Sequence, residues 1–504
     1  MDSVTDWMAS RKILRSVVCL GLLAMLFTSL SPKIVDPDVW WEMAFARQTL
    51  ALGHIPLHDH FAYTPTLFPV MNHEWGGSMI VYWLAGHFGR AGIVAATYLF
   101  GILISLVGIR CARLRGAGFE SLAVMAPVFI ALIIPGFSPI RSQLYSFLFF
   151  AVLLVFLEQD KTGRRGWLAA WPGVYVVWVN LHGGFVVAIV ILAAHCFEQA
   201  LRKRPYVHLV ILIVAMFGLI GVNPYGFHYY SYLRRALFMS RPFSDEWHPL
   251  WSIGKWTQVI IPLLVLYSFA LVLYIVKTLG VKNLSGIVIF LGVALEAVLH
   301  KRMLPFYAIA WISYVPGWIG LTPMGEVISQ LFERRRAILL SVFLAATLFF
   351  TGRFISLRSY RLLAPGDLRA DGLHAYPVGP VDYLKKIDFK GNLMTFFDDG
   401  AYVSWELYPN VLVSMDARYE VAYPDRTVEE NVCFYTAGKG WKTVLARYPT
   451  DLVMIRKKMP IAKALSKTDW RKIYTDSTYE LYERPGLSLP PLDCSNRSFE
   501  GKVP

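Results

Sequence analysis

Long apolar stretches constrain this chain more than any other feature of its sequence. Eleven of them approach the length of about 20 residues, with a lower limit near 17, that an α-helix needs to cross a bilayer. Charged residues make up 17% of the chain, against about 25% in soluble domains. The sequence therefore predicts a polytopic α-helical membrane protein with about eleven transmembrane helices, at residues 13–30, 91–109, 120–136, 143–158, 167–181, 184–200, 207–222, 258–276, 284–299, 303–320 and 337–354.

Basic residues between the apolar stretches predict the direction of the chain in the membrane. Lys and Arg accumulate in cytoplasmic loops, and here they recur on alternate connections. This pattern predicts a multi-pass protein of the cell (inner) membrane, with a cytoplasmic N-terminus and an extracytoplasmic C-terminal domain. The same rule accounts for the net charge of +14, so membrane lipids, and no nucleic acid, are the expected surroundings. The cytoplasmic groups are Arg11/Lys12/Arg15, Arg110/Arg113/Arg115, Lys161/Arg164/Arg165, Arg202/Lys203/Arg204, Lys277/Lys282 and Arg334/Arg335/Arg336.

An acidic, tryptophan-rich loop follows the first apolar stretch. Five carboxylates lie between residues 36 and 75, beside Trp40, Trp41 and Trp75. Acids at a bilayer edge are costly unless they serve a polar cavity or a water-facing site. We therefore interpret residues 31–90 as an outer catalytic loop. The alternative is an ordinary acidic interfacial loop with an aromatic belt. The apolar piece 77–88 is too short to span, which favours a helix that lies in the interface.

Two acids of this loop, Asp36 and Asp38, are the candidate catalytic residues. Asp38 and Glu42 are four residues apart, so they share a face if this segment is helical. A carboxylate can accept a proton from an attacking hydroxyl or amine, or orient a metal ion. The sequence leaves open a divalent metal, Mg²⁺ or Mn²⁺, held by Asp36 and Asp38.

Basic side chains on the other outer loops suit an anionic substrate. Arg, Lys and His can hold a phosphate and stabilise it as it leaves. Each candidate has a plainer alternative: Lys301 and Arg302 as side chains that reach the headgroups, and His182 as the cap of a helical hairpin. The predicted substrate- and phosphate-binding residues are Arg141, His182, His300, Lys301, Arg302, Glu42, His73 and Glu74.

The composition changes after the last apolar stretch. We predict a transmembrane domain over 1–356, a linker over 357–375, an extracytoplasmic α/β domain over 376–484 and a disordered tail over 485–504. Strand-like and helix-like runs alternate in the α/β domain, which predicts a partly parallel sheet. The predicted elements are strands at 391–397, 411–415 and 452–455, helices at 400–407 and 441–447, and a hairpin-like pair over 470–482.

Two features of this domain leave alternatives open. Asp416 and Arg418 at a strand end favour a structural ion pair over a functional role. Cys433 and Cys494 can form a disulfide if the domain is extracytoplasmic.

Taken in order, several motifs resemble the GT-C superfamily of integral membrane glycosyltransferases. They are DPDVWWEMAFARQTLALGHIPLHDHFAYT, NHEW, NLHGG, NPYG and EWHP, followed by Gly400-Ala-Tyr402 and Asp416-Ala-Arg418. The chain resembles bacterial GT-C-like membrane proteins of unassigned substrate and, more distantly, protein mannosyltransferases and aminoarabinose transferases. One departure is Glu42, where such sequences often have His.

The resemblance implies a specific reaction. It is an inverting transfer of a sugar from a polyprenyl-phosphate-linked donor to an extracytoplasmic glycan, lipid or protein. By position, Asp36 or Asp38 takes the role of the base or of the metal-orienting acid.

Two other function classes remain. A transporter or flippase is disfavoured by the few charges within the spans and by the lack of two matching halves with broken helices. A non-catalytic scaffold for envelope assembly would tolerate substitution of Asp38.

Overall fold

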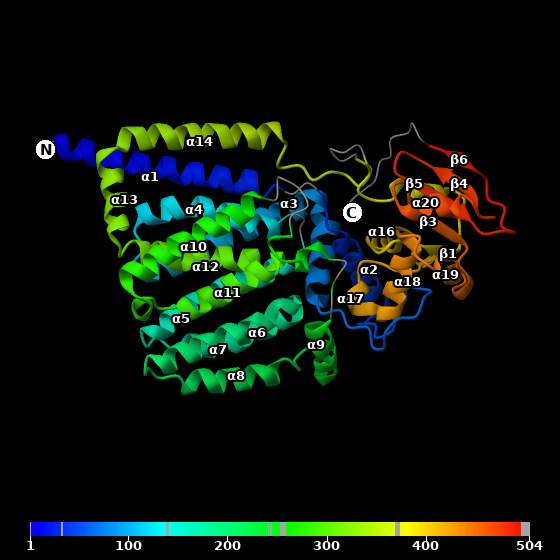
Figure 1. Ribbon diagram of the computed structural model, residues 1–504, viewed down its shortest axis with the longest axis horizontal. Helices are drawn as coiled ribbons and strands as arrows, with labels where there is room; N and C mark the ends of the chain where they lie inside the picture. The colour runs from blue at the N-terminus through cyan, green and yellow to red at the C-terminus, as the bar shows by residue number, and fades with distance from the viewer. Residues whose placement is uncertain are drawn as a thin grey trace. The chain divides into compact units, whose positions relative to one another are not determined.

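The computed structural model describes residues 2–31, 34–137, 141–239, 241, 244–252, 259–367 and 373–494 (Figure 1). The chain divides into two compact units. The first, here called the helical unit, comprises Met1–Lys33, Val94–Asn223 and Met239–Arg361. The second, here called the sheet unit, comprises Ile34–Ile93, Pro224–Phe238 and Leu362–Pro504. Each is described by itself.

The helical unit contains apolar helices that coincide with the predicted stretches, together with α13, a helix that was not predicted from the sequence. They are α1 (Asp2–Ser29), α4 (Phe119–Ile133), α5 (Gln143–Lys161), α6 (Trp167–Leu181), α7 (Val186–Leu201), α8 (Val207–Leu219), α10 (Ile260–Leu279), α11 (Ile287–Leu299), α12 (Leu304–Ile319), α13 (Pro323–Arg334) and α14 (Arg336–Ser356). The second half of α3 (Trp75–Leu114) also belongs to this unit.

Helix α12 forms the centre of the helical unit. Every residue from Leu304 to Ile319 is buried, and the helix packs against α4, α5 and α11. A helix that is apolar on all sides has no face suited to water, so it becomes the core of a bundle. Five aromatic side chains supply much of its buried volume: Phe306, Tyr307, Trp311, Tyr314 and Trp318.

Seven helices of the described residues are long and apolar enough to cross a membrane. A bent pair, residues 301–319 with α13, gives up to eight, and α6, α8 and α11 are shorter apolar helices. The protein is therefore a multi-pass α-helical membrane protein, as predicted. The expected number of eleven crossings stays a prediction.

The segment 77–88 is helical, as predicted. It lies in the first of two helices that make up α3, and the non-helical backbone of Gly89 (φ 54°, ψ −146°) separates that helix from the second. Glycine tolerates this backbone conformation because it has no Cβ. An interfacial position for 77–88 stays a prediction.

The sheet unit contains a six-stranded mixed sheet in the order β2-β1-β3-β5-β4-β6. Strand β1 is parallel to both β2 and β3, whereas β5 is antiparallel to β3 and β4, so the predicted partly parallel sheet is confirmed. The strands are β1 (Gly391–Met394), β2 (Val411–Val413), β3 (Leu452–Arg456), β4 (Arg471–Thr475), β5 (Tyr479–Glu483) and β6 (Leu492–Asp493).

The helices of the sheet unit come from three separate parts of the chain. Within 362–504 the order of strands and helices follows the sequence prediction closely, and apolar side chains such as Phe434, Val453 and Ile455 form a core between sheet and helices. The helices are α2 (Pro37–Leu52), α9 (Tyr229–Phe238), α15 (Val378–Lys386), α16 (Phe397–Leu407), α17 (Tyr419–Ala422), α18 (Asp425–Tyr435), α19 (Trp441–Arg447) and α20 (Pro460–Leu465).

Two expectations about the C-terminal region differ from the structure. The start of the predicted disordered tail contains β6, which pairs in parallel with β4; residues 495–504 lie outside the described residues. Cys433 and Cys494 are both free, so the disulfide that the sequence left open is not formed. Residues 368–372 of the predicted linker also lie outside the described part.

Candidate functional site

The acidic loop belongs to the sheet unit. Ala62 forms a parallel β-bridge to Val413, the last residue of β2. The Tyr63 N–H donates to the Val413 carbonyl at 3.1 Å, and the Val413 N–H donates to the Phe61 carbonyl at 2.9 Å. Residues 61–63 therefore continue the sheet beyond β2, and the loop is not a free connection between two membrane helices.

A buried ion triad fastens the same loop to the strand end. Arg418 Nη1 donates to Asp59 Oδ1 at 2.5 Å, and Arg418 Nη2 donates to Asp416 Oδ2 at 2.6 Å. The three side chains are at most 4% exposed. Burial alone would lower the pKa of Arg418, but the carboxylates of Asp416 and Asp59 raise it well above its ordinary value. These contacts agree with the structural interpretation of the Asp416–Arg418 pair and add a third member.

Asp36 and Asp38 lie at the start of α2. Asp36 is the N-cap: its backbone is extended, and its Oδ1 accepts the Asp38 N–H at 2.9 Å. Pro37 occupies the first helical position, where its missing N–H costs nothing. Asp36 is buried at 4% exposure, whereas Asp38 is half-buried. The local sequence therefore fixes both acids at a helix N-terminus, where the helix dipole favours negative charge.

Aromatic contacts hold α2 against α16. Trp40 packs edge-on to Tyr376 and to Tyr402, with ring centroids 5.3 and 4.9 Å apart. Arg47 Nη2 donates to the Trp405 carbonyl at 2.6 Å, and its guanidinium lies 4.3 Å from the centre of that indole ring. Such edge-to-face and cation–π contacts add to the stabilisation from buried area. The two acids are thus carried by a helix with a fixed position in its unit.

The structure adds Asp398, which sequence reasoning did not select as a site residue. It lies in the first turn of α16, next to Asp399, whose carboxylate binds Arg456 at 2.6 Å and the Tyr479 hydroxyl at 2.9 Å. Burial, then the negative charges of Asp399 and Asp36, raise the pKa of Asp398 to about 6, while Arg456 acts in the opposite sense. Proton-transfer groups work best with a pKa near the operating pH. The Asp-Asp pair after a predicted strand was the available sequence signal.

The remaining predicted residues of the loop lie in α2 and just before the start of α3. Glu42 is buried within α2 at 1% exposure. His73 Nε2 lies 3.4 Å from Glu74 Oε1, and its ring stacks on Tyr232 of α9 with centroids 5.4 Å apart. The Asn72 side chain accepts the Glu74 N–H at 2.8 Å. The NHEW motif therefore opens a helix, and its two titratable side chains interact with each other.

The predicted basic residues form a cluster in the helical unit. Arg141 pairs with Glu246, to which Arg302 Nη1 also donates at 3.4 Å. Lys301 Nζ donates to Asp245 Oδ1 at 3.0 Å. Burial would raise the pKa of Glu246, but the two arginines lower it below its ordinary value. Sequence reasoning did not identify these carboxylates as counter-ions, and a phosphate at this cluster has to share the cations with them.

The two predicted histidines of the helical unit, His182 and His300, each lie at the start of a turn between two helices. His300 Nδ1 lies 3.0 Å from the Trp247 carbonyl. His182 Nδ1 accepts the Gly184 N–H at 2.9 Å and lies 2.7 Å from Ser146 Oγ. A Cβ at Gly184 would lie 2.4 Å from that hydroxyl oxygen, so the turn is tight. These contacts fit the alternative in which His182 caps a helical hairpin, and the phosphate-binding role stays a prediction.

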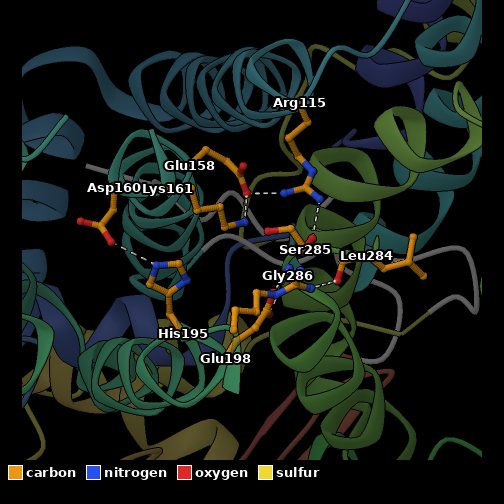
Figure 2. A network of polar contacts seen from close by, with 10 residues as sticks. Arg115, Glu158, Asp160, Lys161, His195, Glu198, Leu284, Ser285 and Gly286 are labelled. Carbon is orange, nitrogen blue, oxygen red and sulfur yellow. Dashed lines mark hydrogen bonds and ion pairs between the residues drawn. The ribbon is translucent and has the colours of Figure 1, made fainter. Parts of the chain in front are cut away.

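A second polar network lies among the helix ends of the same unit (Figure 2). Glu158 lies between Arg115 and Lys161, and all three side chains are at most 9% exposed. Glu198 accepts the Gly286 N–H with both carboxylate oxygens, at 2.7 and 3.0 Å. Each buried charge has an opposite charge or a backbone donor, which is the condition for burying it without large cost. The network ties α5 and α7 to the connection before α11.

Among the described residues, no three side chains of His, Cys, Asp or Glu lie close enough together to form a metal-binding group. The Asp36–Asp38 pair supplies two carboxylates. Mg²⁺ is often held by one or two carboxylates together with substrate phosphates, and a metal at Asp36 and Asp38 stays a prediction.

Comparison with known proteins gives matches in structure and none in sequence. No protein-family model and no curated protein matches this chain. ArnT from Cupriavidus metallidurans bound to undecaprenyl phosphate matches with a TM-score of 0.52 and 12% identity, over 94% of this chain and 98% of that chain. Its apo form matches with a TM-score of 0.50 and 13% identity, over 95% and 98%.

The Archaeoglobus fulgidus oligosaccharyltransferase matches with a TM-score of 0.48 and 13% identity, over 87% of this chain and 67% of that chain. The ArnT likeness spans nearly the full length of both chains and includes the helical and the sheet unit. This chain therefore has the GT-C-like fold of integral membrane glycosyltransferases.

Proposed function

We propose that this protein is a membrane glycosyltransferase that moves a sugar from a polyprenyl-phosphate-linked donor to a glycan, lipid or protein acceptor. The observation that carries the proposal is the fold shared, almost from end to end, with an ArnT bound to undecaprenyl phosphate. The proposed site faces the outside of the cell (inner) membrane, with the N-terminus in the cytoplasm and the sheet unit extracytoplasmic.

The reaction is a single displacement at the anomeric carbon. An acceptor oxygen or nitrogen forms the new bond to the sugar, and the bond between the sugar and the donor phosphate breaks. The polyprenyl phosphate leaves with the electron pair, and a carboxylate takes the proton of the acceptor. Asp38 is our candidate for this base because its carboxylate is half-buried and is not the N-cap of α2. Asp36 positions the helix start, and a base at Asp36 itself is the second form of the proposal.

Three cations are proposed to hold the donor phosphate: Arg141, Arg302 and Lys301. Their present partners are carboxylates of the 245–246 segment, so the donor phosphate would replace or share those partners. Arginine suits this role because its planar fork binds phosphate oxygens in pairs. His182, His300, His73 and the acids Glu42 and Glu74 stay proposed contacts to the substrate. A Mg²⁺ or Mn²⁺ ion at Asp36 and Asp38 would neutralise phosphate charge.

The test measures release of free polyprenyl phosphate by purified protein in nanodiscs. A panel of polyprenyl-phosphate sugars serves as donor, and a crude envelope extract serves as acceptor. We expect Asp38→Asn to lower the release rate by about 10²–10⁴-fold, the usual worth of a general base. Asp36→Asn tests the second form. Asp425→Asn is the matched control, because this acid belongs to the same unit and its side chain is 81% exposed.

The outcomes separate the function classes. Release that both Asp36→Asn and Asp38→Asn retain at the wild-type rate contradicts the proposed catalytic loop. Movement of the donor across vesicle membranes without a covalent product indicates a transporter or flippase. Full complementation of a deletion strain by both variants, with no release from any donor, indicates a scaffold.

A further inference from the structure

A hollow of about 170 Å³ lies in the helical unit where α1, α4, α13 and α14 meet. About 10–15 Å³ is enough for one water, so the space can take a larger group. Its walls combine charged and aromatic side chains. They include Arg11, Arg15, Arg336, Glu120, Phe119 and Phe332.

The hollow lies at one end of two candidate membrane-spanning helices. Helices α1 and α14 run side by side (Figure 1), and Thr28 Oγ1 donates to the Phe350 carbonyl at 2.8 Å. A Cβ at Gly21 would touch Thr347. The two contacts follow one another in the same order along both helices, so the helices are parallel. Their membrane-spanning stretches begin at Arg11 and at Arg336, so both begin at the same end. Helix α13, bent by 87° from the span before it, lies across this end.

The hollow favours an anion. Three guanidinium groups and two carboxylates line it, Glu120 and Glu333 being the acids. Arg15 Nη2 lies 3.3 Å from Glu120 Oε1, and its guanidinium lies 5.1 Å from the centre of the Phe119 ring. The three cations outnumber the two acids by one, which favours an anionic ligand.

We propose that this hollow binds the phosphate-bearing headgroup of an anionic membrane lipid. The phosphate would bind Arg15, Arg11 and Arg336 through charge-assisted hydrogen bonds. The acyl chains would cover the apolar faces of α1 and α14, where Ile13 is 54% and Ile338 55% exposed. Basic pockets between transmembrane helices are suited to such headgroups. A free phosphate offers the same headgroup chemistry but would leave those apolar faces uncovered.

The test is native mass spectrometry of the delipidated, purified protein. It is titrated with phosphatidylglycerol, with the zwitterionic phosphatidylcholine and with inorganic phosphate. We expect phosphatidylglycerol to bind wild type, and the Arg15→Gln/Arg336→Gln double variant to bind it at least about tenfold more weakly. Lys12→Gln is the matched control, because Lys12 is an exposed cation on the same turn of α1 and does not line the hollow; it should bind like wild type.

Two results would overturn the proposal. One is equal affinity of the double variant and wild type for phosphatidylglycerol. The other is binding of inorganic phosphate that phosphatidylglycerol does not displace, which would assign the hollow to a soluble anion. If the double variant does not fold, Ser329→Trp replaces it. This substitution fills the hollow from α13 without removing charge, and the same loss of lipid binding is expected.

Discussion

Substitution of Arg418 tests whether the ion triad joins the acidic loop to the sheet. Arg418 Nε donates to both oxygens of Asp416, at 2.9 and 3.1 Å, in addition to its bonds from Nη1 and Nη2. Arg418→Met removes all of these bonds and leaves the carboxylates of Asp59 and Asp416 buried without their cation. Loss of one partner from a buried ion pair costs about 3–5 kcal/mol. We therefore expect the free energy of unfolding to fall by about 4 kcal/mol, a drop of roughly 10 °C in the Tm of the sheet unit if this unit unfolds in its own transition.

The assay is thermal unfolding in detergent, with two comparison variants. Arg426→Gln removes an arginine of the same unit whose side chain is 71% exposed and pairs with Glu430. Exposed pairs contribute about 0–1 kcal/mol, so this control should barely change Tm. The triple variant Asp59→Asn/Asp416→Asn/Arg418→Met should recover part of the loss, since it leaves no unpaired charge. If Arg418→Met costs no more than the control, the triad does not hold the loop to the sheet.

Three further substitutions test other parts of the account by thermal unfolding. Burial and nearby acids raise the pKa of Asp398 from 3.8 to about 6, so the folded state favours the neutral acid and loses about 3 kcal/mol of stability as the pH rises from about 4 to 6. Asp398→Asn should remove that loss; a Tm difference from wild type that is the same at pH 4 and pH 7 would contradict this. Glu158→Gln should cost about 3–5 kcal/mol because it leaves two buried cations unpaired; an unchanged Tm would mean that the network is hydrated. Gly400→Ala should cost about 3 kcal/mol or more, because a Cβ there would lie 1.9 Å from the Met415 carbonyl oxygen. Gly86→Ala, with no atom within 4 Å, is its control, and equal effects of the two would refute the close contact.

Local patterns predicted most of the individual elements. Apolar stretches mark helices because lipid leaves every backbone group to be satisfied within the helix, and each of the eleven predicted stretches coincides with a helix. In the sheet unit, β1, α16, β2, α19 and β3 lie where alternating runs placed them. The segment 77–88 also forms a helix as predicted, and the non-helical backbone of Gly89 separates it from the apolar helix that follows.

Long-range contacts could not be predicted from one sequence. Asp59 and Arg418 are 359 positions apart, and nothing in either local pattern indicates the other. The pairing of Arg141 with Glu246, 105 positions away, was missed for the same reason. Asp398 was not among the predicted site residues, because its raised pKa comes from burial and from the charges of Asp399 and of Asp36 in a distant segment. The sequence thus indicated which residues carry charge, and the fold decides which charges meet.

The most direct test of the proposed function follows a labelled sugar. Wild type and the Asp36→Asn/Asp38→Asn double variant are compared in nanodiscs, with a polyprenyl-phosphate-linked labelled sugar and an envelope extract. The account predicts that wild type forms a covalently labelled acceptor together with an equal amount of free polyprenyl phosphate. It also predicts that the folded double variant forms neither above background. Labelled acceptor formed at the wild-type rate by the double variant would contradict the proposed role of the acidic loop. If wild type forms no labelled product from any donor, the protein is not the proposed transferase.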